Sequence, residues 1–183
     1  GNYRGTYERE FSILRKSIYA EDVKATFPTV SYNGTQQKPV PVVTYNGMEL
    51  AEDDFVITSY GTNIEAGTGF VRVEGKNNYT SNTTWYFTIN PKEISEMTIK
   101  DIPDQIYTGS KIKPNIEIPI DDFESLEEGK DYTVKFIQNI ENGTARGAIT
   151  GKGNYTGVVE KSFTIKPKSL ANVKNVKIEE IAS

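Results

Sequence analysis

The sequence of 183 residues contains no cysteine and no histidine. Without cysteine the chain has no disulfide bond, no thiol nucleophile and no thiolate ligand for a metal ion. Without histidine it has no imidazole base and no Ser-His-Asp triad. Lysine and arginine total 21 against 25 aspartate and glutamate residues, and the resulting net charge of −4 gives no basic surface for nucleic acid. These absences lead us to expect no enzyme activity, no resident cofactor and no nucleic-acid partner.

Long hydrophobic runs are also missing. No apolar stretch approaches the roughly 18 residues of a membrane-spanning helix, and the N-terminus lacks the apolar centre of a signal peptide. An apolar fraction of 36% is low for one large globule and suits small modules with much surface for their volume. We therefore expect soluble modules without membrane insertion, and any secretion signal or wall anchor would lie outside this segment.

What the sequence does contain is a repeat with a period of 76 residues. A tyrosine that follows asparagine stands at positions 3, 79 and 155, and the motif Phe-Ser/Thr-Ile begins at positions 11, 87 and 163. Such periodicity is the signature of tandem modules. It divides the chain into the tail of one repeat (1–17), two full repeats (18–91 and 92–167) and the head of another repeat (168–183).

Each repeat has the pattern of short strands joined by tight turns. Residues 70–73, 132–136 and 162–165 have the alternation and the composition of half-buried strands. Asn-Gly pairs, as at 46–47, favour the turns between strands. This pattern predicts an all-β fold of tandem small antiparallel Ig-like β-sandwich modules. The alternative is a single curled antiparallel sheet in each module.

The closing strand of each repeat carries a phenylalanine and an isoleucine that we assign to the core. Phe11 and Ile13 occupy these positions in the partial first repeat. Because both side chains need burial, we expect residues 1–17 to pack against the first full repeat. We interpret three glycines, Gly75, Gly151 and Gly153, as sites of a β-bulge or of a turn with positive φ.

The second full repeat carries four motifs in a distinctive order: Tyr-Thr-Gly (107–109), Asp-Tyr-Thr-Val (131–134), Gly-Lys-Gly-Asn-Tyr-Thr-Gly (151–157) and Phe-Thr-Ile-Lys-Pro-Lys (163–168). This order resembles the tandem bacterial Ig-like, or MBG-like, repeats of large secreted and cell-surface proteins of Gram-positive gut bacteria. The first full repeat departs from it, with Asn77 and Ser81 in place of two glycines and Asp54-Phe55 in place of Asp-Tyr.

The resemblance covers nearly the whole chain and implies an extracellular β-module. The role it implies is that of a non-catalytic spacer or stalk whose partners are the neighbouring repeat modules of the parent chain. The alternative is an adhesin module that binds a polysaccharide or another host ligand. The motifs are specific for the repeat and not for an activity, since one fold serves many functions.

The only tryptophan is the first candidate for ligand contact. Trp85 stands two residues before a closing phenylalanine, where the other repeats carry Arg9 and Lys161. Basic side chains at this position indicate a half-exposed site, so Trp85 would be free to stack on a polysaccharide or host glycan. Trp85 also shares its strand face with Phe87, so the alternative is that it extends the core. Tyr86 is the second candidate, but it points to the opposite face and cannot form one platform with Trp85.

An acidic turn is the third candidate. Glu52, Asp53 and Asp54 are adjacent, and a second acidic group follows within 121–131. Ca²⁺ takes six to eight oxygen ligands, so we consider a calcium site at the three adjacent carboxylates. Their spacing lacks the Asp-x-Asp-x-Asp-Gly pattern of an EF-hand loop, and solvated turn charge is the simpler interpretation.

Overall fold

The computed structural model describes residues 1–169. In this part of the chain the regular structure consists of β-strands and two short 3₁₀ turns, η1 (Glu52–Asp54) and η2 (Ile94–Glu96). The prediction of an all-β fold is confirmed. The chain divides between Asn90 and Pro91 into two units, which we call unit 1 and unit 2.

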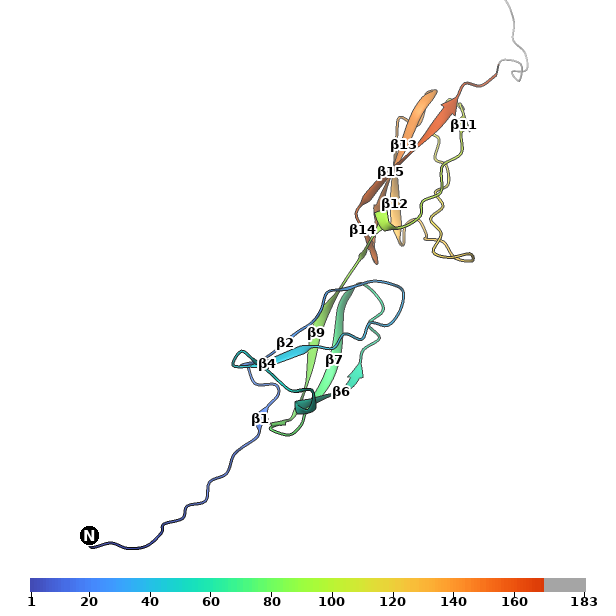
Figure 1. Ribbon diagram of the computed structural model, residues 1–183. Helices are drawn as coiled ribbons and strands as arrows, with labels where there is room; N and C mark the ends of the chain where they lie inside the picture. The colour runs from blue at the N-terminus through green and yellow to red at the C-terminus, as the bar shows by residue number, and fades with distance from the viewer. Residues whose placement is uncertain (170–183) are drawn as a thin grey trace, which may run out of the picture. The chain divides into compact units, whose positions relative to one another are not determined.

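Unit 1 contains a four-stranded sheet in the order β3-β9-β7-β6 (Figure 1). Its strands are β3 (Val30–Ser31), β6 (Phe55–Tyr60), β7 (Gly67–Gly75) and β9 (Asn82–Asn90). On one face of β7 and β9 lie Val71, Val73, Phe87 and Ile89, which are all buried. Because alternate residues of a strand point to opposite faces, these side chains define the inner face of the sheet.

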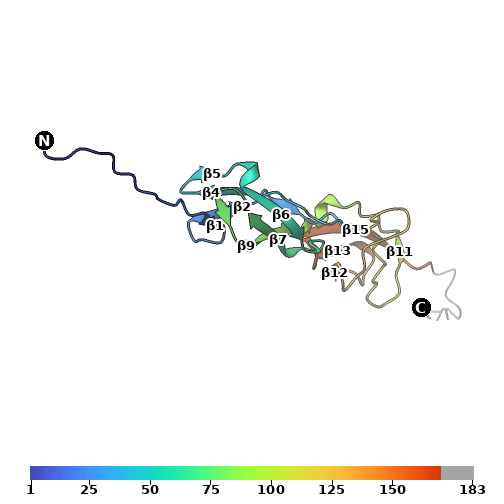
Figure 2. The same cartoon turned by 90° about the horizontal axis from the view of Figure 1, so that it is seen from below.

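A second sheet of unit 1 follows the order β2-β4-β5. Its strands are β2 (Val23–Thr26), β4 (Val42–Tyr45) and β5 (Met48–Glu49), which lie together in Figure 2. The turn between β4 and β5 is the predicted Asn46-Gly47 pair, with φ of 51° and 79°. Positive φ at both positions is what a two-residue hairpin turn requires, and asparagine and glycine tolerate it best.

Side chains of both sheets meet in one hydrophobic cluster. Ile18, Val23 and Val43 are buried in it, and Phe55 of β6 and Trp85 of β9 pack against it from the four-stranded sheet. This cluster thus joins side chains of β2 and β4 to Phe55 of β6 and Trp85 of β9. A two-residue strand, β1 (Lys16–Ser17), joins the edge of this unit by pairing with β8 (Tyr79–Thr80).

Unit 2 contains a four-stranded sheet in the order β11-β15-β13-β12 and a small pair β10-β14. Its strands are β10 (Lys92–Glu93), β11 (Gln105–Ile106), β12 (Tyr132–Ile137), β13 (Gly143–Gly151), β14 (Tyr155–Thr156) and β15 (Val158–Lys166). Strands β13 and β15 lie 76 residues after β7 and β9. The sequence period is therefore also a period of the strands.

The segment of unit 2 that corresponds to β4 is not a strand in the described structure. Ile118, at the position of Val43, is fully buried, and the Lys100 N–H still donates to the Glu117 carbonyl at 3.0 Å. Pro119 takes the position of Thr44 and has no N–H for a ladder hydrogen bond. One proline thus interrupts the regular pairing while the core contact remains.

The expected antiparallel pairing is wrong at the sheet edges. β6, β7 and β9 pair antiparallel, as do β12, β13 and β15, but β3 runs parallel to β9 and β11 runs parallel to β15. A parallel pair needs a long connection, and about fifty residues separate β3 from β9. The local strand pattern does not reveal such a distant pairing.

The expectation that residues 1–17 pack against unit 1 is wrong for most of the segment. Phe11 and Ile13 are 84% and 86% exposed, and residues 1–14 run clear of the strands of unit 1 in both views (Figures 1 and 2). Only Arg15 to Ser17 dock, through β1 and a hydrogen bond from Arg15 Nε to the Asn77 carbonyl at 2.7 Å. The closing strands β9 and β15 are buried because β7 and β13 pair with them. No strand of the described residues pairs with residues 1–14.

The interpretation of the three glycines is confirmed for Gly153, whose φ is 66°, and is wrong for Gly75 and Gly151. Neither has a positive φ, and neither lies at a break in the strand register. A Cβ atom on Gly75 would lie 2.7 Å from the Thr80 nitrogen, and one on Gly151 would lie 2.6 Å from the Thr156 nitrogen. Glycine is required at both positions because the backbone of the following turn passes directly over the strand.

Unit 2 contains a buried phenol that has no equivalent in unit 1, where Phe55 takes its place. Tyr132 is 2% exposed and its hydroxyl donates to the Ile116 carbonyl at 2.9 Å. Burial, followed by the charges of Glu128 and Asp131, raises the pKa of Tyr132 above its ordinary value of 10.0. The native state therefore favours the neutral phenol.

This buried phenol makes the stability of unit 2 sensitive to alkali. Because the folded pKa is raised, its contribution is fully present below pH 10 and is lost as the pH rises above 10 through the folded value. We expect Tyr132→Phe to reduce that alkaline loss, while costing about 1 kcal/mol at neutral pH for the lost hydrogen bond. Urea unfolding followed by circular dichroism at several pH values checks this, and an unchanged alkaline slope in the variant would contradict it.

Candidate functional site

The structure places the two aromatic candidates on opposite faces of β9. Trp85 is half-buried on the inner face, where its ring makes an edge contact with Phe55 at a centroid distance of 6.2 Å. Tyr86 lies on the other face and is 66% exposed. The alternative in which Trp85 extends the core therefore matches its position, and Tyr86 is the aromatic side chain available to a ligand.

The acidic turn forms hydrogen bonds within itself and to the turn that follows β7. Asp54 accepts a hydrogen bond from the Ala51 N–H through its carboxylate at 3.3 Å, and its carbonyl accepts the Lys76 N–H at 2.7 Å. The Asp53 carbonyl accepts Nδ2 of Asn77 at 2.9 Å. Glu52 completes η1, which therefore holds the turn after β7 in place. Within residues 1–169 no group of three or more acidic side chains is arranged to hold a metal ion, and calcium at this turn stays an untested prediction.

The second acidic group also organises its own turn. The carboxylate of Asp121 accepts hydrogen bonds from the backbone N–H groups of Phe123 and Glu124, each at 2.8 Å. These two bonds lower the pKa of Asp121 below its ordinary value. A carboxylate bound in this way stabilises the loop, as Asp does in an Asx turn.

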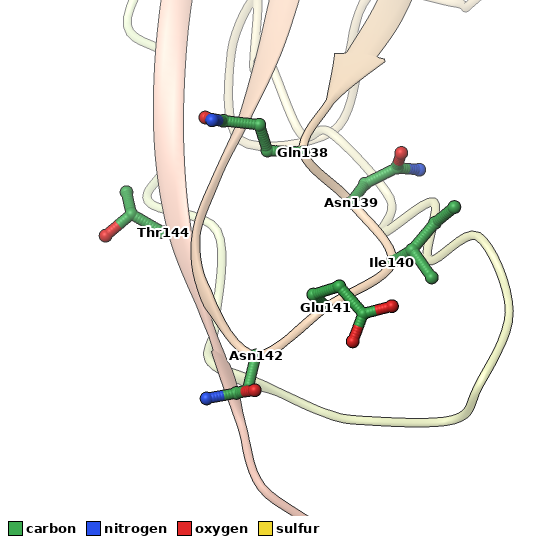
Figure 3. Close-up of a pocket in the computed structure, with 6 residues that line it drawn as sticks. All are labelled: Gln138, Asn139, Ile140, Glu141, Asn142 and Thr144. Atoms are coloured by element: carbon green, nitrogen blue, oxygen red, sulfur yellow. The ribbon is translucent and has the colours of Figure 1, made fainter.

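A pocket of about 550 Å³ lies at the loop between β12 and β13. Figure 3 shows its lining residues, which are Gln138, Asn139, Ile140, Glu141, Asn142 and Thr144. Their side chains diverge to the two sides of the loop. Asn139 already donates a hydrogen bond from Nδ2 to the Ile112 carbonyl at 2.8 Å. Specific ligand sites need polar groups that converge, so we assign no ligand to this pocket.

Two buried asparagines were not singled out by the sequence analysis. Asn63 Nδ2 donates to the Gln37 and Phe70 carbonyls at 3.2 and 3.0 Å, and its Oδ1 accepts the Phe70 N–H at 3.0 Å. Asn139, 76 residues later, donates from Nδ2 to the Ile112 carbonyl at 2.8 Å, and its own backbone carbonyl accepts the Ile112 N–H at 2.8 Å. Buried polar groups must be satisfied, and each of these amides ties a long loop to its hairpin. Their recurrence in both repeats was the available signal.

The junction between the units is a single residue. The Asn90 carbonyl accepts the Tyr32 N–H at 2.8 Å within unit 1, and the Lys92 N–H donates to the Asn154 carbonyl at 2.8 Å within unit 2. Only Pro91 lies between these two anchored residues, and its ring fixes φ near about −65°.

Comparison with protein-family models gives no match, and neither do comparisons with curated proteins and with solved structures. Among the described residues, none of the helical segments has the length and the apolar character needed to cross a membrane.

Proposed function

We propose that the chain is a non-catalytic spacer built from Ig-like β-sandwich modules, which holds other parts of its parent protein at a distance. The observation that carries the proposal is the junction at Pro91, because hydrogen bonds anchor the residues on both of its sides. A short junction between folded modules limits their relative motion, unlike a flexible linker rich in glycine and serine. The neighbouring modules of the parent chain are then its first partners.

Two further features support this proposal. Each unit uses a buried asparagine, Asn63 or Asn139, to fix one of its own loops, and the exposed Asp121 fixes a further loop of unit 2. The motifs of the second repeat resemble those of bacterial Ig-like modules, which favours an extracellular position on a bacterial surface. We therefore propose a secreted or cell-surface location for the parent protein.

The junction can be tested with spin labels, since the absence of native cysteine gives each introduced thiol a unique label. Thr68 and Thr144 are exposed and occupy equivalent positions in the two units. We expect double electron–electron resonance on the Thr68→Cys, Thr144→Cys chain to give a narrow distribution of distances between the two spin labels. A six-residue Gly-Ser insertion after Pro91 is the matched control and should broaden it. A native distribution as broad as that of the insertion variant would overturn the proposal.

A further inference from the structure

The outer face of the unit 1 sheet, opposite Val71 and Val73, carries an aromatic pair. Phe70 of β7 and Tyr86 of β9 are directly paired across the strands, and their ring centroids are 6.5 Å apart. Tyr86 is 66% exposed, so one edge of this pair faces solvent. The two ring planes are inclined by 58°, so the exposed Tyr86 ring is the one that an apolar face of a ligand can cover, and Phe70 supports it from the adjacent strand.

A cation adjoins this pair. The guanidinium carbon of Arg72 lies 5.6 Å from the centroid of the Phe70 ring, a cation–π contact. Arg72 is exposed and takes part in no ion pair with any residue of the described chain. Its charge is therefore available to a carboxylate from outside.

A shallow pocket of about 390 Å³ continues from Arg72 along the same face. Its outer-face lining residues are Thr58, Arg72, Glu74, Asn82 and Thr84. Glu74 is neutralised by Lys76 at 2.7 Å, so the pocket presents one uncompensated positive charge. Hydroxyl, amide and guanidinium groups around one hollow beside aromatic rings are the donors and acceptors that suit a sugar with several hydroxyls.

Unit 2 lacks this combination on its equivalent face. Ser162 replaces Tyr86, Ala148 replaces Arg72, and Arg146 replaces Phe70. The charge of Arg146 is compensated by Glu160 at 3.3 Å. The same fold thus tolerates an outer face without rings and without a free cation, so the features of unit 1 are not needed for folding.

We propose that this outer face of unit 1, centred on Tyr86, Phe70 and Arg72, binds an acidic polysaccharide. The Tyr86 ring takes the apolar face of one sugar, and Arg72, held over the Phe70 ring, donates a charge-assisted hydrogen bond to the carboxylate of a uronic acid. The site lies on the opposite face of β9 from Trp85. It adds an attachment function to the spacer and does not depend on rigidity at Pro91.

The test measures binding of the full chain to polygalacturonate and to its methyl-esterified form, by calorimetry at low ionic strength in the presence of a calcium chelator. We expect binding to polygalacturonate and weaker binding to the ester, which lacks the charge. The variants take the residues that unit 2 carries at the same positions, so Tyr86→Ser and Arg72→Ala should fold. Each should weaken the affinity about tenfold, and added salt should weaken it further.

The matched control is Tyr19→Ser, since Tyr19 is also 66% exposed and lies outside the pocket and the aromatic pair. Its affinity should equal that of the unchanged chain. Absence of polygalacturonate binding, equal binding of the ester, or an equal loss in Tyr19→Ser would each overturn the proposal. So would self-association by sedimentation that Tyr86→Ser abolishes, because the face would then be a contact between two copies of the chain.

Discussion

Replacing Ile89 by alanine should lower the free energy of unfolding of unit 1 by about 3 kcal/mol. Ile89 is 1% exposed on the inner face of β9, and its truncation leaves a cavity at a fully buried position. Trp85 gives a probe specific to unit 1, because it is the only tryptophan and lies on the same face of the same strand as Ile89. Urea unfolding followed by tryptophan fluorescence measures the loss.

The chain supplies its own control for this substitution. Ile13 occupies the same repeat position as Ile89 but is 86% exposed, so Ile13→Ala should change the unfolding free energy by less than about 0.5 kcal/mol. The two variants remove the same atoms from the same motif. Equal destabilisation would mean that residues 1–14 are buried against unit 1 in solution, in conflict with the structure.

Replacing Gly75 by alanine should destabilise unit 1 by about 2 to 3 kcal/mol. The added methyl group would lie 2.7 Å from the Thr80 nitrogen and 2.9 Å from the Thr80 carbonyl oxygen. These are backbone atoms, and a hydrogen bond from the Gly75 N–H to the Ser81 carbonyl at 2.9 Å holds the turn in place. The strain cannot be relieved by rotating a side chain.

Thr68→Ala is the control for this second experiment, since Thr68 lies on the same strand with an exposed side chain. It should stay close to the unchanged chain in the same fluorescence assay. If Gly75→Ala proved equally harmless, the close approach of the turn to β7 would be wrong. Gly151→Ala repeats the test in unit 2, where a Cβ would lie 2.6 Å from the Thr156 nitrogen, and circular dichroism follows it.

The elements that the sequence predicts well are those with local causes. Alternation of side chains predicts the strands at 70–73, 132–136 and 162–165, which lie within β7, β12 and β15. The Asn46-Gly47 pair predicts a hairpin turn that the structure contains. Both signals arise from the φ/ψ preferences of neighbouring residues and need no knowledge of distant partners.

The features that the sequence does not reveal depend on distant contacts. β3 pairs with β9 across about fifty residues, and Pro119 breaks the counterpart of β4 without exposing Ile118. The prediction that Phe11 and Ile13 are buried is wrong for a related reason, because an apolar residue is buried only where a partner strand covers it. Composition marks such residues as core candidates without supplying that strand.

The candidate site likewise contains features that local sequence predicts and features that depend on distant contacts. Strand alternation correctly separates Trp85 from Tyr86, because adjacent residues of a strand face opposite sides. It does not reveal that Tyr86 lies beside Phe70, or that Arg72 lies over the Phe70 ring. Those neighbours come from the register between β7 and β9, which is set by the whole sheet.

The position of β15 has a mechanical consequence. This strand carries the chain out of the sheet of unit 2 and lies between β13 and β11, with eight residue pairs to β13 alone. Tension applied beyond Lys166 acts along the strand, whereas its antiparallel hydrogen bonds run perpendicular to it. The bonds are then loaded in shear and must break together, not one after another as in a peeled hairpin. A pull along β15 would thus meet all of its hydrogen bonds to β13 at once.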